Sequence, residues 1–168
     1  GMKAQIPGTV KFIFQPAEEG FSELPSATTT SIGAKAMVDQ GVMDKVDAVF
    51  GLHITPNLPV GMVGYRSGPL MAGADRVSIK VTGRQTHGAA PWAGVDPIVA
   101  SAQIIGALQT IVSRQLNISK EPAVLTIGAI NGGNRENIVP DTVEMLGTLR
   151  TFDEDMRAEA KKRITVTA

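Results

Sequence analysis

Two neighbouring carboxylates and a histidine are the residues of this sequence whose types and spacing first suggest chemistry. Glu18 and Glu19 end one apolar run, and His53 ends a second. Adjacent carboxylates repel each other unless a positive charge lies beside them, and a divalent ion supplies that charge. One carboxylate is then free to bind the ion while the other handles a proton, which suits metal-assisted hydrolysis. The competing interpretation is an ordinary Glu-Glu pair on a solvated surface.

The elements that must position these residues form a predicted βαβ unit. Residues 8–15 and 46–54 predict strands, and residues 30–41 predict a helix. A right-handed crossover makes the two strands parallel, so both end on the same side of the sheet. Ligands of open α/β sheets bind outside the carboxyl ends of strands, where all three candidate residues fall. The pattern therefore predicts a metal site on this rim.

A second unit is expected after a stretch rich in Gly and Pro at residues 59–69. We expect residues 1–67 to belong to one domain and residues 68–168 to another. The second unit reads as a strand, a helix, two strands and a charged helix, the order of a ferredoxin-like split βαβ without its last strand. The fold class expected for the whole chain is α/β in the broad sense (α+β): a partial parallel sheet followed by this β-α-β-β-α unit. Its predicted elements are a strand at 74–83, a helix from Pro97 to about Leu116, strands at 122–131 and 142–151, and a helix from about Asp153.

Local signals within the second unit are specific enough to test. Asp96 is a predicted N-cap with Pro97 at the first helical position, and Asp75 is assigned to turn geometry. An apolar series at steps of three or four predicts the buried face of the first helix. It consists of Ile98, Ala102, Ile105, Leu108 and Val112.

Composition excludes several classes of function. The 168 residues carry 16 basic and 16 acidic side chains, so no nucleic acid and no anionic membrane is expected as a partner. The apolar runs are too short to cross a bilayer. The chain has no cysteine, so any metal must be held by His and carboxylate. We expect a cytoplasmic protein, and the Gly1-Met2 start and missing flanking strands suggest the middle part of a longer one.

Four ordered motifs resemble the M20 metallopeptidases. The nearest branch is similar to the amidohydrolases that cleave N-acyl amino acids, such as hippurate hydrolase and the indole-acetyl-amino-acid hydrolases. The motifs are FQPAEEG at residues 14–20, GLH at 51–53, GRQTHGAAP with GVDP at 83–91 and 94–97, and NIVPD at 137–141.

The resemblance implies roles for the first three candidate residues. Glu18 corresponds to the general base, and Glu19 and His53 correspond to ligands of two divalent ions, zinc in most members but also manganese or cobalt. The other metal ligands of the family have no counterpart here, and two ligands are fewer than a catalytic zinc site keeps. We therefore expect the chain to be inactive by itself.

The resemblance also implies a ferredoxin-like lid that forms a homodimer. His87 corresponds to a histidine that reaches into the partner's site and steadies the oxyanion, Asn137 to a substrate contact, and Arg150 to an aid in binding the substrate carboxylate. Competing interpretations make His87 an anchor of its own loop, Asn137 a cap of the hairpin, and Arg150 a solvated or structural arginine.

The predicted function is a fragment of a metal-dependent hydrolase that cleaves the amide bond of N-acyl amino acids or small peptides. The alternative is a non-catalytic dimerisation module or truncated pseudo-enzyme. The acyl group, the amino acid and the metal are left open by the sequence.

Overall fold

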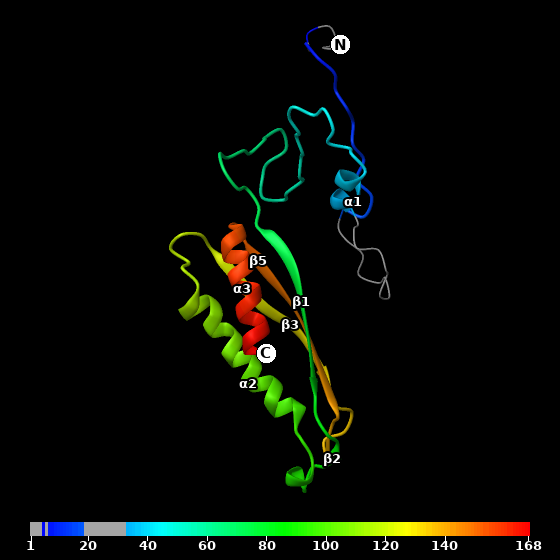
Figure 1. Cartoon of the computed structure of the whole chain (residues 1–168), viewed down its shortest axis with the longest axis vertical. Coiled ribbons are helices and arrows are strands. Elements are labelled where there is room, and N and C mark those ends of the chain that lie inside the picture. Colours follow the sequence, from blue (N-terminus) through cyan, green and yellow to red (C-terminus); the bar gives the residue numbers. More distant parts are fainter. Residues whose placement is uncertain (1–4, 6, 19–32) are drawn as a thin grey trace. The chain divides into compact units, whose positions relative to one another are not determined.

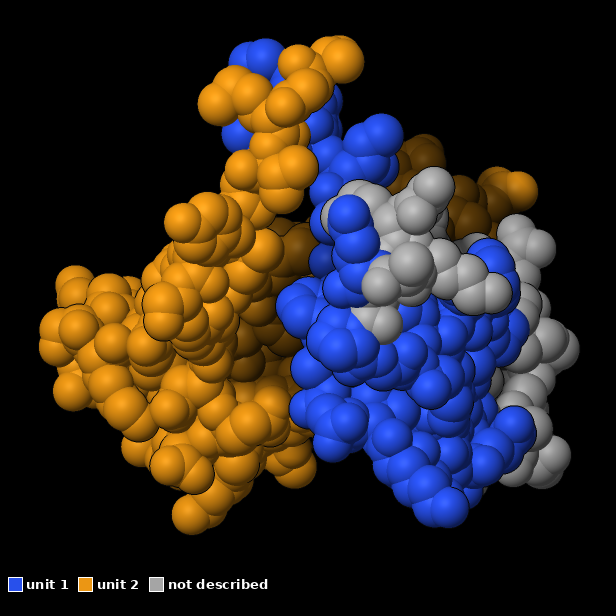
Figure 2. Space-filling model, turned by 90° about the horizontal axis from the view of Figure 1, so that it is seen from above, with its two compact units in different colours: residues 1–59 blue, residues 60–168 orange. Residues whose placement is uncertain are grey.

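The computed structural model describes residue 5, residues 7–18 and residues 33–168. The chain divides into two compact units, residues 1–59 and residues 60–168, which are coloured separately in Figure 2. The predicted domain boundary after residue 67 stays a prediction.

Helix α1, Gly33–Asp39, is the one α-helix among the described residues of the first unit, and it falls within the helix predicted at 30–41. The two predicted strands at 8–15 and 46–54 are wrong for this structure, because neither segment pairs with a strand in the part of the chain that the structure describes. Phe12 and Phe50 are 79% and 92% exposed. A parallel strand is an apolar run that must be covered on both faces, and the described residues of this unit provide no such cover.

The second unit contains a three-stranded antiparallel sheet in the order β1-β5-β3. Its helices α2 and α3 lie on one face of the sheet (Figure 1). The order and the antiparallel pairing are those of a ferredoxin-like unit, so the α+β class and the β-α-β-β-α sequence of elements are confirmed. The elements are β1 at Gly73–Thr82, α2 at Pro97–Thr110, β3 at Ala123–Gly132, β5 at Thr142–Thr151 and α3 at Glu154–Thr167.

Three short elements were not predicted. Strands β2, Thr86–His87, and β4, Ile138–Val139, pair as a separate two-stranded ribbon, and a short 3-10 helix, η2, follows at Pro91–Ala93. Helix α2 continues directly into a π-helical turn, η3, at Ile111–Gln115.

The core lies between α2, α3 and the covered face of the sheet. The predicted buried face of α2 is confirmed in part. Leu108 is buried and Val112 packs against the core, but Ile98 is 45% exposed, and the fully buried Ser101 was not predicted. The hydroxyl of Ser101 donates to the carbonyl of Pro97 at 2.6 Å, so the buried polar group is satisfied. A pattern of apolar residues does not identify a buried serine of this kind. The buried core cluster consists of Val77, Leu108, Ile111, Leu125, Leu149, Ala160 and Ile164.

Helix α2 begins as predicted. The carboxylate of Asp96 accepts hydrogen bonds from the backbone N–H groups of Ile98 and Val99 at 2.9 and 3.2 Å, and Pro97 occupies the first turn. Helix α3 begins in the same manner, because Asp153 accepts from the N–H of Met156 at 2.8 Å.

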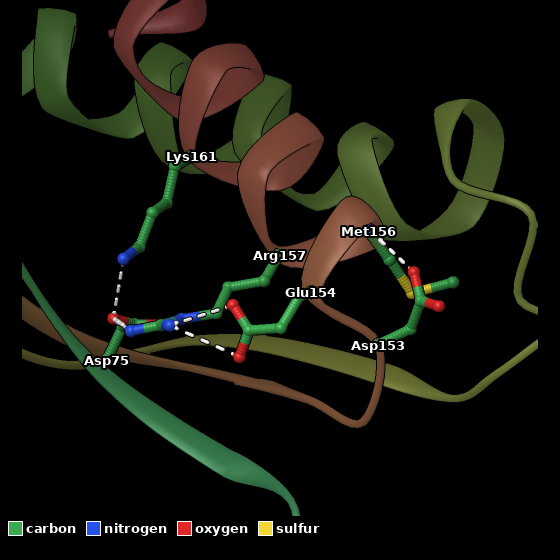
Figure 3. A network of polar contacts seen from close by, with 6 residues as sticks. All are labelled: Asp75, Asp153, Glu154, Met156, Arg157 and Lys161. Carbon is green, nitrogen blue, oxygen red and sulfur yellow. Dashed lines mark hydrogen bonds and ion pairs between the residues drawn. The ribbon is translucent and has the colours of Figure 1, made fainter.

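An ion-pair cluster joins α3 to the edge strand β1 (Figure 3). The guanidinium of Arg157 donates from Nε and an Nη to both oxygens of Asp75, at 2.7 and 2.8 Å, and Lys161 Nζ lies 2.8 Å from Oδ1. The hydrogen bond from Arg157 is the main cause that lowers the pKa of Asp75 to about 2; burial opposes it and Lys161 adds to it. Asp75 therefore binds a helix, and its assignment to turn geometry is wrong.

No helix in the described part of the chain is long and apolar enough to cross a bilayer.

Candidate functional site

The β2–β4 ribbon brings together two of the predicted site residues. His87 pairs with Ile138, so the residue before Ile138, Asn137, lies beside the residue after His87. The N–H of Gly88 donates to the carbonyl of Asn137 at 2.7 Å. A Cβ at Gly88 would lie 3.1 Å from backbone atoms of Asn137, so glycine permits this close approach. Both His87 and Asn137 are exposed, and the ribbon presents them to solvent.

The imidazole of His87 is held by its own turn. Its Nδ1 accepts a hydrogen bond from the N–H of Ala89 at 3.0 Å. The N–H of Ala90 donates to the carbonyl of His87 at 2.9 Å, and the hydroxyl of Thr86 donates to the carbonyl of Ala90 at 3.2 Å. His87 therefore anchors its loop through Nδ1, and the described residues provide no hydrogen-bond partner for its other ring nitrogen.

The loop that carries His87 is closed at its base. Arg84 and Val95 exchange backbone hydrogen bonds of 2.9 and 3.0 Å. A Cβ at Gly94 would lie 2.5 Å from the carbonyl oxygen of Arg84, so this closure requires glycine. The ribbon and this bridge hold the loop from both sides. Strand β2, which contains His87, lies at the end of the long strands (Figure 1).

A polar hollow of about 370 Å³ lies next to β4. The sequence predicted no functional role for Gln85, Asn131 or Asn134. The signal available for two of them was the Asn-Gly-Gly-Asn run at 131–134, in which two amide side chains flank two glycines. The polar side chains that line the hollow are those of Gln85, Asn131, Asn134, Asp141, Thr142 and Glu144.

Arg150 lies away from the ribbon within the same unit. It belongs to the far end of β5, opposite Ala74, eight residues beyond Thr142. At 3.4 Å per residue this separation is about 27 Å. Arg150 is exposed and alternates with the buried Leu149 and Thr151, so it projects from the face of the sheet opposite to the helices. Its role in substrate binding stays a prediction.

The predicted metal-binding residues lie in the first unit. Glu18 is exposed, and Glu19 lies outside the described residues. His53 is also exposed, and its Nδ1 lies 2.6 Å from the carbonyl oxygen of Ile54. Within residues 5, 7–18 and 33–168, no group of three or more His, Cys, Asp or Glu side chains could hold a metal ion. The donors fit a divalent ion in kind, since they are imidazole and carboxylate, but the described residues do not complete a site.

Comparison with known proteins agrees with the motifs. The family described as peptidase family M20/M25/M40 matches residues 1–155. An N-acetyl-L-cysteine deacetylase of Bacillus subtilis (strain 168) is 44% identical over 158 residues, which cover 94% of this chain and 35% of the relative. Thermostable carboxypeptidase 2 of Saccharolobus solfataricus is 43% identical over 161 residues, covering 95% and 38%. This chain therefore spans little more than a third of the length of these curated relatives.

Solved structures support the same assignment. A protein of methicillin-resistant Staphylococcus aureus, described as an aminohydrolase, matches 91% of this chain and 38% of its own with a TM-score of 0.75 and 37% identity. A Bacillus subtilis protein, described as a dinuclear metal binding peptidase from the M20 family, matches 92% of this chain and 36% of its own with a TM-score of 0.53 and 35% identity. The chain belongs to peptidase family M20/M25/M40.

Proposed function

We propose that this chain forms part of a metal-dependent hydrolase that cleaves the amide bond of N-acyl amino acids or small peptides. The observation that carries the proposal is the ribbon that holds His87 and Asn137 together and exposes both. The names of two relatives, a deacetylase and a carboxypeptidase, support the reaction class, because both activities break a C–N amide bond.

In this proposal, different residues of the chain act as general base and as metal ligands. Glu18 takes a proton from the attacking water, and Glu19 and His53 would supply an oxygen and a nitrogen to a bound metal. The chemistry that a bound divalent ion supplies is Lewis acidity, which makes a water easier to deprotonate and a carbonyl easier to attack. Zinc is the metal we propose, with manganese or cobalt as substitutes.

The ribbon residues act on the substrate. His87 donates a hydrogen bond to the oxygen that becomes negative when the amide carbon is attacked. Asn137 donates to or accepts from the substrate beside it, and the polar side chains of the neighbouring hollow extend this surface. Arg150 is assigned to the substrate carboxylate. Arg150 lies far from the ribbon of its own subunit. In this proposal it therefore contacts a substrate that is not bound at that ribbon.

We further propose that the second unit forms a homodimer and that His87 acts in the partner's site. Strand β1 is an edge strand in the order β1-β5-β3, and unpaired edges favour association with another chain. A groove of about 580 Å³ runs between β1 and α3, lined by Ile79, Lys80 and Ile164 among others. Sedimentation of the chain should show a dimer or a larger species.

A second candidate is a dimerisation module without chemistry. The open edge of β1 and the incomplete set of metal donors among the described residues favour it. The two candidates differ in one measurable property, since only the hydrolase loses turnover when His87 is changed.

An amide-hydrolysis assay tests the proposal. The full-length protein encoded with this chain is offered a panel of N-acyl amino acids and dipeptides, with added zinc, manganese or cobalt. The hydrolase should release the amino acid with at least one substrate, and His87→Ala should reduce the rate while the protein stays folded. Absence of turnover across substrates and metals, with the metal shown to be bound, would support the module instead.

A further inference from the structure

The two histidines of the chain use the same ring nitrogen to contact opposite kinds of backbone group. The Nδ1 of His53 lies 2.6 Å from the carbonyl oxygen of Ile54, and the Nδ1 of His87 lies 3.0 Å from the backbone nitrogen of Ala89. A carbonyl oxygen only accepts a hydrogen bond, whereas an amide N–H only donates one. A hydrogen bond at each contact therefore requires a proton on the Nδ1 of His53 and a lone pair on the Nδ1 of His87.

The other ring nitrogen follows directly. A neutral imidazole has one proton shared between two nitrogens, so the state of Nδ1 decides that of Nε2. In His53 the Nε2 then carries a lone pair and no proton. In His87 the Nε2 carries the proton and is a hydrogen-bond donor. Both side chains are exposed, so each Nε2 is accessible to a ligand from outside the local backbone.

We propose that the backbone of this chain presets its two histidines in opposite tautomers, each suited to its role. This inference rests on the proposed function. A metal takes a lone pair, and metal-binding histidines typically donate their second N–H to a carbonyl, as His53 does to Ile54. An oxyanion takes a proton donor, and the His87 tautomer offers Nε2–H without needing a positive charge.

The turn around His87 makes its tautomer a property of the fold. The ring contact to Ala89 lies inside a turn closed by the N–H of Ala90 and the hydroxyl of Thr86. The same turn is joined to β4 through Gly88 and Asn137. Ala89 is thus a positioning residue that acts through His87. One net hydrogen bond is enough to bias the tautomer ratio by about five- to tenfold.

Nitrogen NMR of the complete 168-residue chain tests the proposal. The sample contains no metal or substrate and is held at about pH 9, above the usual titration range of imidazole. Variants His53→Gln and His87→Gln assign the ring signals, since each leaves one histidine. We expect protonated Nδ1 in His53, protonated Nε2 in His87, and a coupling across the hydrogen bond between the amide nitrogen of Ala89 and Nδ1 of His87. The same tautomer in both rings, or averaged tautomers as in the urea-unfolded chain, would overturn the proposal.

A pair of variants tests the cause. Ala89→Pro removes the donating N–H, and the preceding Gly88 tolerates the restriction that proline imposes. Ala89→Gly keeps the N–H and is the matched control. The His87 tautomer ratio should fall about five- to tenfold in the proline variant and stay near the parent's in the glycine variant. An unchanged ratio in Ala89→Pro would contradict the role of Ala89. Where proline disturbs the turn, the coupling measured in the parent chain decides.

The experiment is independent of catalysis. Wrong tautomers overturn this inference and leave the amide-hydrolysis assay of the full-length protein as it stands. Correct tautomers in a protein that hydrolyses no amide contradict the proposed function alone.

Discussion

At the scale of single residues, the two neighbouring carboxylates are assigned different tasks. In the full-length protein, Glu18→Gln should keep the metal and lose turnover, because glutamine preserves size and polarity but accepts no proton. General-base catalysis is worth about 10²- to 10⁴-fold in rate. Glu19→Gln should lose metal affinity first. Metal analysis beside kinetics separates the two, and equal metal loss in both variants would contradict the division.

Gly88 provides a second test at the residue scale. Gly88→Ala places a Cβ 3.1 Å from the backbone of Asn137, so the ribbon must shift by a few tenths of an ångström. We expect the hydrolysis rate of the full-length protein to fall about tenfold, because small displacements of positioned groups weaken transition-state contacts. The control is Gly106→Ala, whose Cβ would meet no atom within 4 Å and which lies in α2. Equal rates in both variants would show that the approach of Gly88 to Asn137 has no functional role.

Site residues could be predicted from the sequence where they belong to recognisable motifs, but their contacts could not. Glu18, His53, His87 and Asn137 belong to motifs whose composition is unusual enough to notice. The contact between Nδ1 of His87 and Ala89 depends on ring orientation within a turn, which no residue pattern expresses. The pairing of β2 with β4 was missed because two-residue strands are too short to show periodicity.

At the scale of elements, the Asp75 cluster fastens α3 to β1. The carboxyl pKa of Asp75 is lowered in the folded state, so the cluster stabilises the fold fully above the ordinary value of 3.8 and loses this contribution as pH falls through about 2. A shift of this size corresponds to about 2 kcal/mol. Asp75→Asn should therefore lower the free energy of unfolding by about that amount at pH 7, and the difference from the parent should shrink toward pH 2.

Urea unfolding at pH 7 and at lower pH measures this difference. The control is Glu154→Gln, since Glu154 contacts Arg157 at 3.0 Å but its side chain is 85% exposed. Exposed ion pairs contribute under about 1 kcal/mol. If the two variants lose equal free energy of unfolding at pH 7, the Asp75 cluster stabilises the fold no more than the exposed pair of Glu154 and Arg157 does.

The predicted elements of the second unit agree with the structure because each is encoded locally. The alternating strand at 74–83 and the Asp96-Pro97 helix start need no information from distant residues. The predictions of strands at 8–15 and 46–54 were wrong because a strand forms only when it pairs with neighbouring strands. An apolar run does not indicate whether such neighbours are present. The buried face of α2 was predicted correctly at Leu108 and Val112 and wrongly at Ile98. Ser101 was missed because its hydroxyl is satisfied by the carbonyl of Pro97, which an apolar pattern does not reveal.

At the scale of the whole molecule, we predict that the number of metal ligands limits metal binding by this chain alone. We expect the isolated chain to bind zinc only weakly, because Glu19 and His53 are fewer than the three protein ligands of a catalytic zinc site. Calorimetry at neutral pH measures this affinity, with His53→Gln as the control for a site that uses the imidazole. A stoichiometric site with submicromolar affinity would show that the chain supplies further ligands.

The most direct test of the account is activity in mixed dimers of the full-length protein. His87→Ala and Glu18→Gln are each nearly inactive as homodimers in this account. After subunit exchange, a mixed dimer has one site with an intact Glu18 and a His87 from its partner. Random pairing makes about half of the dimers mixed, so about a quarter of the parent activity should return. A mixture that stays as inactive as its two components, with exchange demonstrated by differently tagged subunits, would contradict the proposal that His87 acts across the dimer.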